Sequence, residues 1–208
     1  MVVEGVSVFA LEPDGWNRWH AVILGHGAGK NKDSDFMQFF HRGLCESGWL
    51  SVVFNFPYME QGRRMPDHQT KLRACFRSVV HQVRSRFEPR TTLIGGKSMG
   101  GRVASYIADD TEGVDGLIFL GYPLHPPGKQ DRMRDAHLYE SSTPMLFISG
   151  TRDPLAREDL LDDVVRRIGA RARLVWIQGG DHSFQVRKSD AETLPTALAA
   201  ILDWAGTL

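Results

Sequence analysis

The chain has 208 residues, of which 42% are hydrophobic and 24% charged, a balance that is typical of soluble globular proteins and excludes disordered and fibrous classes. Twenty-five basic residues balance twenty-five acidic ones, so net charge favours neither nucleic acid nor an anionic membrane as a partner. The length predicts a single domain over 1–208, and the two cysteines have neither metal-ligand spacing nor a disulfide framework.

The N-terminal residues lack the basic residues and the long apolar run of a secretory signal. No apolar stretch approaches the roughly twenty residues that span a bilayer, because Gly, Pro, Asp or Arg interrupts each one. We therefore expect a cytoplasmic protein without a membrane partner.

Short apolar runs alternate with helical patterns along the chain, which is typical of a parallel sheet with helices on both faces. The expected strands cover 21–24, 52–54, 92–94, 117–120, 145–148 and 174–177. Each run is apolar at consecutive positions, so each strand should be buried on both faces. Apolar residues recur at helical spacing in 36–44, 72–83, 103–108, 160–168 and 194–202. The pattern predicts an α/β fold with a mostly parallel central sheet.

The segment 91–101 is predicted to be a strand, a tight turn and the start of a helix, and it contains a Gly-x-Ser-x-Gly pattern centred on Ser98. The chemistry needs Gly96 and Gly100, because a side chain two positions from the strained serine would collide with neighbouring elements. Ser98 is thus predicted to be a nucleophile, and the Met99 N–H to donate to an oxyanion from the helix start. A phosphate-binding turn is the alternative, but its fingerprints have different glycine spacing.

A serine hydroxyl needs a general base and an orienting carboxylate, and both are expected in loops at the carboxyl ends of later strands. Asp153 follows the strand 145–148, and His182 follows the strand 174–177. The order Ser, Asp, His predicts a catalytic triad of Ser98, Asp153 and His182. Alternatives are that Asp153 caps a helix, that His182 is a surface histidine, and that Asp181 is the acid; an immediate neighbour rarely points at the same imidazole.

The second oxyanion donor is expected in the loop Gly25-His26-Gly27-Ala28-Gly29, whose small residues let the backbone approach a substrate. We expect the Ala28 N–H to donate, with Gly29 as the alternative. His26 is expected to be a structural hydrogen-bonding residue, because no carboxylate partner is visible in the sequence.

Several motifs together resemble one α/β-hydrolase family. The motifs are Gly25-His26-Gly27-Ala28-Gly29, Asn55-Phe56-Pro57-Tyr58, Gly62-Arg63-Arg64, Gly95-Gly96-Lys97-Ser98-Met99-Gly100-Gly101-Arg102, Gly121-Tyr122-Pro123-Leu124 and Gly180-Asp181-His182. The family is the group related to testis-expressed protein thirty and to the hydrolase-like subunit of the non-specific-lethal chromatin complex. The resemblance covers nearly the whole chain and implies an α/β-hydrolase fold with a predicted hydrolase activity. It leaves a scaffold role open, because some members serve as complex subunits.

Two loops on the triad's side of the sheet are expected to shape a pocket. Tyr58 in one loop, and Tyr122 and Leu124 in the other, are predicted to line it with Gly29. About twenty residues separate Leu124 from the next strand, too few for a large cap domain. Arg63 and Arg64 are predicted to hold a carboxylate or phosphate of the substrate, and a solvated pair or a structural salt bridge is the alternative.

We therefore expect a serine hydrolase that cleaves an acyl ester or thioester of a small molecule through an acyl-enzyme intermediate, with no metal or organic cofactor and no nucleic-acid partner. Two alternatives stay open. One is a non-catalytic interaction module with this fold, and the other is a peptidase or acyltransferase that uses the same triad. The sequence does not indicate an oligomeric state.

Overall fold

The computed structural model describes residues 1–3, 5–186 and 193–208. Its strands are β1 (Val2–Val3), β2 (Val6–Leu11), β3 (His20–Gly25), β4 (Leu50–Phe54), β5 (Thr91–Lys97), β6 (Gly116–Leu120), β7 (Met145–Gly150) and β8 (Ala172–Ile177). Its helices are α1 (Asp35–Glu46), α2 (Pro57–Glu60), α3 (Gln69–Phe87), α4 (Met99–Ser105), α5 (Ala136–Glu140), α6 (Glu158–Ile168) and α7 (Thr193–Ala205), with a short 3-10 helix at Gly169–Arg171.

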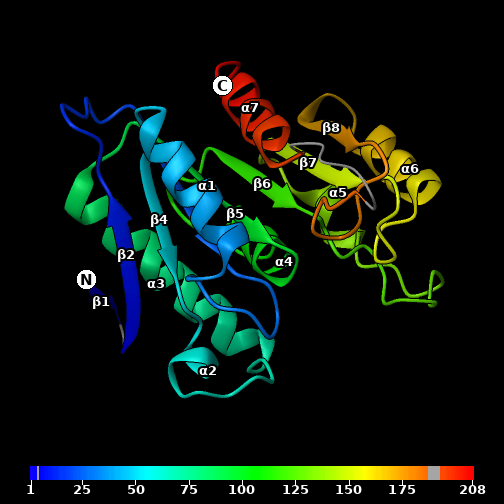
Figure 1. Cartoon of the computed structure of the whole chain (residues 1–208), viewed down its shortest axis with the longest axis horizontal. Coiled ribbons are helices and arrows are strands. Elements are labelled where there is room, and N and C mark those ends of the chain that lie inside the picture. Colours follow the sequence, from blue (N-terminus) through cyan, green and yellow to red (C-terminus); the bar gives the residue numbers. More distant parts are fainter. Residues whose placement is uncertain (4, 187–192) are drawn as a thin grey trace.

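The strands form one twisted sheet in the order β1-β2-β4-β3-β5-β6-β7-β8 (Figure 1). All neighbours from β4 to β8 pair in parallel, whereas β2 pairs antiparallel with both β1 and β4. The expected mostly parallel sheet is thus confirmed. From the central strand β3 the chain adds β4 on one side and β5 to β8 on the other. The connecting helices therefore cover both faces of the sheet.

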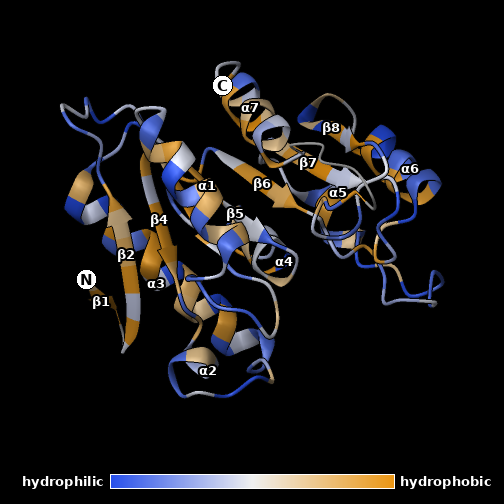
Figure 2. Ribbon diagram, in the orientation of Figure 1, coloured by the Kyte–Doolittle hydropathy of each residue, from blue (hydrophilic) through white to orange (hydrophobic). Residues whose placement is uncertain are grey.

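Helices α1 and α7 pack on one face of the sheet, and α3, α4 and α6 pack on the other (Figure 1). Each face therefore has its own apolar core. Figure 2 shows apolar residues along the central strands and polar residues on the outer surfaces of the helices. Strands β4, β6 and β7 are buried along their whole length, as their uninterrupted apolar runs predict.

Three details differ from the sequence-based expectation. Strands β1 and β2 were not predicted, although the alternation of apolar Val6 and Val8 with polar Ser7 is the sequence signal of a half-buried strand. Strand β8 is only partly buried, because it is the last strand of the sheet. Helix α4 ends at Ser105 rather than continuing to position 108, where the chain turns with shorter-range hydrogen bonds.

The parallel strands bring the loops after β3, β5, β6, β7 and β8 to one edge of the sheet. Between β6 and β7 the described segment 121–144 contains only the five-residue helix α5, so no large cap covers this edge, as expected. Among the described residues, no helix is both long and apolar enough to cross a membrane.

Candidate active site

Ser98 lies in a tight turn between the central strand β5 and helix α4. Its backbone has φ 50° and ψ −108°, a strained conformation that costs a residue with a Cβ on the order of 1–3 kcal/mol. The turn is held on both sides, because the Ser98 N–H donates to Leu120 O at 3.1 Å and its carbonyl accepts from Arg102 N at 3.1 Å. This arrangement lifts the partly exposed serine above the edge of the sheet.

The glycines on either side of Ser98 are required by the neighbouring strand. A Cβ on Gly96 would lie 2.0 Å from Gly25 O, and one on Gly100 would lie 2.1 Å from the same atom. Gly96 also has a φ of +143°, which L side chains rarely adopt. The expected steric reason for the Gly-x-Ser-x-Gly spacing is therefore present: helix α4 packs directly on the end of β3.

His182 and Asp153 meet although 29 positions separate them in the sequence. The imidazole Nδ1 lies 2.7 Å from Asp153 Oδ2, and the Asp153 side chain is fully buried while that of His182 is 23% exposed. Asp153 Oδ1 also accepts from Leu155 N at 2.8 Å, which fixes the plane of the carboxylate. A buried carboxylate facing Nδ1 holds the proton on that nitrogen and leaves Nε2 as the free base.

Asp181 is the alternative acid, and its contacts serve its own loop instead. Its Oδ1 accepts from Ser183 N at 2.8 Å and from Gln185 N at 3.0 Å. This is an Asx turn that shapes the backbone after β8. The carboxylate that contacts the imidazole belongs to Asp153.

The described residues show no hydrogen bond between the Ser98 hydroxyl and the imidazole, a contact that is often long in free enzymes. The two loops are nevertheless adjacent. A Cβ on Gly121 would lie 3.0 Å from both His182 O and Lys97 Nζ, and Lys97 immediately precedes Ser98. The imidazole and the serine therefore belong to one cluster of loops.

The loop after β3 lies against the serine, as expected for an oxyanion loop. A Cβ on Gly27 would lie 3.8 Å from Ser98 Cβ. Ala28 and Gly29 follow and are exposed, so their backbone is open to a ligand. On the other side, Met99 is the first residue of α4, where a backbone N–H has no acceptor within the helix. The geometry thus brings both expected donor segments beside Ser98.

His26 holds this loop in place. Its Nε2 accepts from Phe56 N at 3.0 Å, so the proton is on Nδ1, which donates to Gly27 O at 2.8 Å. Burial lowers the pKa of His26 to about 4, so the ring is neutral near pH 7. The side chain is fully buried and does not face a substrate. The expected structural role of His26 is borne out by these contacts.

The sequence predicts no role for Lys97, and the structure gives its side chain several contacts. Its side chain is buried, its Nζ donates to His182 O, and the aromatic rings of Phe36 and Phe184 lie 5.3 Å and 5.8 Å from the ammonium. Burial lowers the pKa of Lys97 to about 8, while Asp153 and Asp181 oppose the shift. A charged residue at the end of an otherwise buried strand is the sequence signal that could have indicated such a contact.

Three residues that we expected to line a pocket are instead part of the core. Tyr58 and Leu124 have no exposed surface, and Tyr122 is 1% exposed. Tyr122 faces inward because its hydroxyl donates to Arg134 O at 2.7 Å and its ring packs on Phe119. The Tyr58 hydroxyl is buried near Gly29 without completing a hydrogen bond. The aromatic residues of these loops anchor the loops rather than form the walls of an open pocket.

Arg63 and Arg64 lie on an exposed loop after α2. Arg63 donates to Asp67 Oδ1 at 2.6 Å and to Gln61 Oε1 at 2.9 Å. These contacts favour the structural alternative for Arg63. Arg64 is exposed, and its side chain forms no hydrogen bond or ion pair with a described residue.

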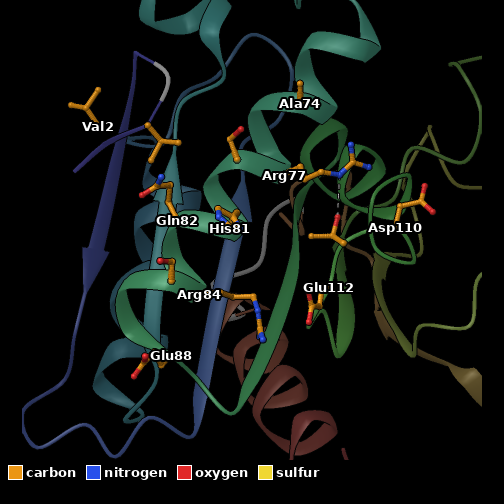
Figure 3. Close-up of a pocket in the computed structure, with 13 residues that line it drawn as sticks. Val2, Ala74, Arg77, His81, Gln82, Arg84, Glu88, Asp110 and Glu112 are labelled. Carbon is orange, nitrogen blue, oxygen red and sulfur yellow. Dashed lines mark hydrogen bonds between the residues drawn. The ribbon is translucent and has the colours of Figure 1, made fainter.

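A large surface hollow lies away from this cluster. It has a volume of about 960 Å³ and lies on the outer side of α3, where Figure 3 shows Arg77, His81 and Arg84 near Asp110 and Glu112. The Arg84 guanidinium donates hydrogen bonds there to Gly113 O and Thr92 Oγ1. The hollow therefore has mixed charge and contains none of the residues around Ser98.

The sheet order, the elbow at Ser98 and the absence of a large cap among residues 5–186 and 193–208 define a lidless α/β-hydrolase fold. The chain belongs to the Alpha/beta hydrolase domain family, whose profile matches residues 18–206. Fold and family together are those of hydrolases.

Solved structures agree with this fold. A dienelactone hydrolase from Anabaena variabilis superposes with a TM-score of 0.78 at 18% identity, covering 97% of this chain and 91% of that one. A serine hydrolase without lid from Xanthomonas campestris gives 0.76 at 19% identity, with coverages of 98% and 93%. An alpha-beta serine hydrolase homologue from Coxiella burnetii gives 0.76 at 17% identity, with coverages of 95% and 91%. At such low sequence identity, these matches show a shared fold and no more.

Proposed function

We propose that the protein is a serine hydrolase that cleaves an acyl ester or thioester through an acyl-enzyme intermediate. The single observation that carries the proposal is the 2.7 Å contact between His182 Nδ1 and the fully buried Asp153 carboxylate, in the loops beside the strained Ser98. A buried carboxylate costs free energy unless it is paired, so this pair is a specific feature of the fold.

The proposed reaction has two halves, acylation of Ser98 and hydrolysis of the acyl-enzyme, and each of these groups acts in both. Ser98 Oγ attacks the acyl carbon while its proton passes to His182 Nε2, and Asp153 stabilises the resulting imidazolium. The negative charge on the carbonyl oxygen accepts hydrogen bonds from Met99 N–H and Ala28 N–H, with Gly29 as the alternative donor. The imidazolium then protonates the departing alcohol or thiol, and water releases the acyl group by the same steps in reverse.

A fluorophosphonate probe tests this proposal. We expect covalent labelling of Ser98, located by peptide mass spectrometry, and loss of labelling in Ser98→Ala. Ser85→Ala is a matched control, because Ser85 is an exposed serine of α3 outside these loops. Absence of labelling at Ser98 would contradict the proposal and favour the non-catalytic interaction module.

A substrate panel then separates the enzyme alternatives. Esters and thioesters of graded acyl length should be hydrolysed, whereas peptides should not. A product transferred to an added acceptor alcohol in preference to water would indicate an acyltransferase.

We also propose that the chain is one cytoplasmic domain that acts on a small acyl substrate, and that its nearer relatives are the group of testis-expressed protein thirty and the non-specific-lethal subunit. This finer relationship rests on the shared motifs around His26, Ser98 and His182. It leaves a complex-subunit role open, which co-purification with cellular partners would detect.

A further inference from the structure

Three arginines from three different elements lie within electrostatic reach of helix α4 and His137. They are Arg73 on α3, Arg102 on α4 and Arg134 in the loop before α5. The Arg73 guanidinium lies 3.9 Å from the ring centre of Tyr106, and that ring stacks on His137 at 3.9 Å. All three arginines are partly buried, so their charges are less screened than those of exposed side chains.

No anion within the described residues neutralises this cluster. None of the three arginines forms an ion pair there, and the Nε atoms of Arg73 and Arg102 are buried without a hydrogen-bond partner. Among the described residues, the Arg134 guanidinium donates only to a backbone carbonyl, Pro123 O, at 3.3 Å. Asp135 is the carboxylate nearby, and it accepts the Tyr139 hydroxyl at 2.6 Å. Buried guanidinium nitrogens without partners are costly, so a ligand that pairs them is expected to be stabilising.

Burial is the largest cause of two lowered pKa values near these arginines, and the arginine charges add to it. Burial, Arg73 and Arg102 together lower the pKa of His137 to about 4, against the weaker opposing effect of Asp135. Burial and Arg102 also lower the pKa of Arg134. The region is therefore a local site of positive potential on a chain with no net charge.

The cluster flanks the proposed nucleophile. Arg102 is one helical turn from Ser98, and its N–H donates to the Ser98 carbonyl. Arg134 contacts the loop that leaves β6 directly after Leu120, whose carbonyl accepts the Ser98 N–H. Long side chains on a helix point back toward its N-terminus, which here is the end that carries Ser98.

We propose that Arg102 and Arg134, with Arg73 behind them, bind a carboxylate or phosphate group on the substrate, so that the enzyme prefers anionic esters. The proposal rests on the proposed function and names its substrate class. It assigns to these arginines the anion selection that the sequence suggested for Arg63 and Arg64. Guanidinium groups suit this role, because their planar donors match carboxylate and phosphate oxygens.

The first test is kinetic. We compare kcat/KM for a carboxylate-bearing ester, a phosphate-bearing ester and a neutral ester of the same shape. The wild type should prefer one of the anionic esters, and Arg102→Gln and Arg134→Gln should each reduce that preference by about tenfold to a hundredfold. The anionic ester with the higher kcat/KM shows whether the site binds a carboxylate or a phosphate group. Arg132→Gln is the matched control, an exposed arginine of the same loop as Arg134, and should keep the preference.

The second test needs no catalysis. Inorganic phosphate, compared with chloride at equal ionic strength, should raise the Tm of wild type and of Arg132→Gln. The rise should be smaller in Arg102→Gln and Arg134→Gln than in wild type. Because the comparison is between variants in one buffer, the general stabilising effect of phosphate cancels.

The outcomes distinguish the two proposals. If no ester is hydrolysed but phosphate stabilisation depends on Arg102 and Arg134, the hydrolase proposal fails and the anion site stands. If esters are hydrolysed with a preference that is unchanged in both variants, the anion site is wrong. A preference lost only in Arg63→Gln or Arg64→Gln would return the role to those residues and also overturn the proposal.

Discussion

The Lys97 ammonium donates a hydrogen bond to the main-chain carbonyl of His182, so the residue before the proposed nucleophile holds the residue that is proposed to be its base. We predict that Lys97→Met, which keeps the length of the side chain but removes its donor, lowers kcat by about tenfold to a hundredfold with a smaller effect on KM. Steady-state kinetics on a p-nitrophenyl ester measure this. A wild-type kcat in the variant would show that the contact does not position the imidazole.

The same lysine predicts a pH dependence of stability. Burial lowers the pKa of Lys97 to about 8 from 10.5, so the folded protein releases this proton before the unfolded chain does. Between about pH 8 and 10.5 the unfolded state binds more protons, and the contribution of Lys97 to the free energy of unfolding rises with pH. Urea titrations at several pH values in this range give the free energy of unfolding of wild type and of Lys97→Met. Plotted against pH, this free energy should rise less steeply in the variant. An equal dependence on pH in the two proteins would mean that a group other than Lys97 causes it.

Substitutions in the proposed triad should separate its members. Ser98→Ala and His182→Ala are expected to lower kcat by roughly four to six orders of magnitude, and Asp153→Asn somewhat less. Asp181→Asn is the matched control, because an amide oxygen can still accept from Ser183 N and Gln185 N. If Asp181→Asn were the more damaging of the two, the assignment of the acid to Asp153 would be wrong.

The turn around Ser98 should tolerate no side chain at Gly100. A Cβ there would lie 2.1 Å from Gly25 O and 2.4 Å from Gly25 C, and both atoms are backbone that lacks room to move. We predict that Gly100→Ala lowers the free energy of unfolding by at least about 3 kcal/mol or prevents folding. Gly206→Ala is the control, since its Cβ would have only ordinary contacts from 3.5 Å outward. A Gly100→Ala protein of wild-type stability would contradict this packing.

His26 predicts an acid-sensitive fold. Its pKa is lowered to about 4 from 6.5 by burial, so between these values the unfolded chain binds a proton that the folded protein does not. The free energy of unfolding should therefore fall as the pH drops from about 6.5 to 4, by up to about 1.4 kcal/mol per pH unit from this residue. In His26→Gln the slope should be smaller by this amount. If the free energy of unfolding depended on pH equally in wild type and His26→Gln, folding would not lower the pKa of His26.

Local patterns in the sequence determined the fold class and the three residues of the proposed triad. Uninterrupted apolar runs predict parallel strands, since only strands buried on both faces avoid polar alternation. The Gly-x-Ser-x-Gly spacing marks Ser98, because a single tight turn sets the steric demand within five residues. The order of the loops placed Asp153 and His182, since the carboxyl ends of parallel strands meet at one edge.

Only the tertiary structure decided which side chains face which, because burial and pairing depend on residues far apart in the chain. It brought Asp153 rather than Asp181 to the imidazole, since the Asp181 carboxylate is used by backbone amides of its own loop. It placed Tyr58 and Tyr122 in the core, although aromatic residues in such loops are equally compatible with a pocket. It paired Arg63 with Asp67 and left Arg102 without a carboxylate partner among the described residues, because the charge around a guanidinium is set by the packing of separate elements.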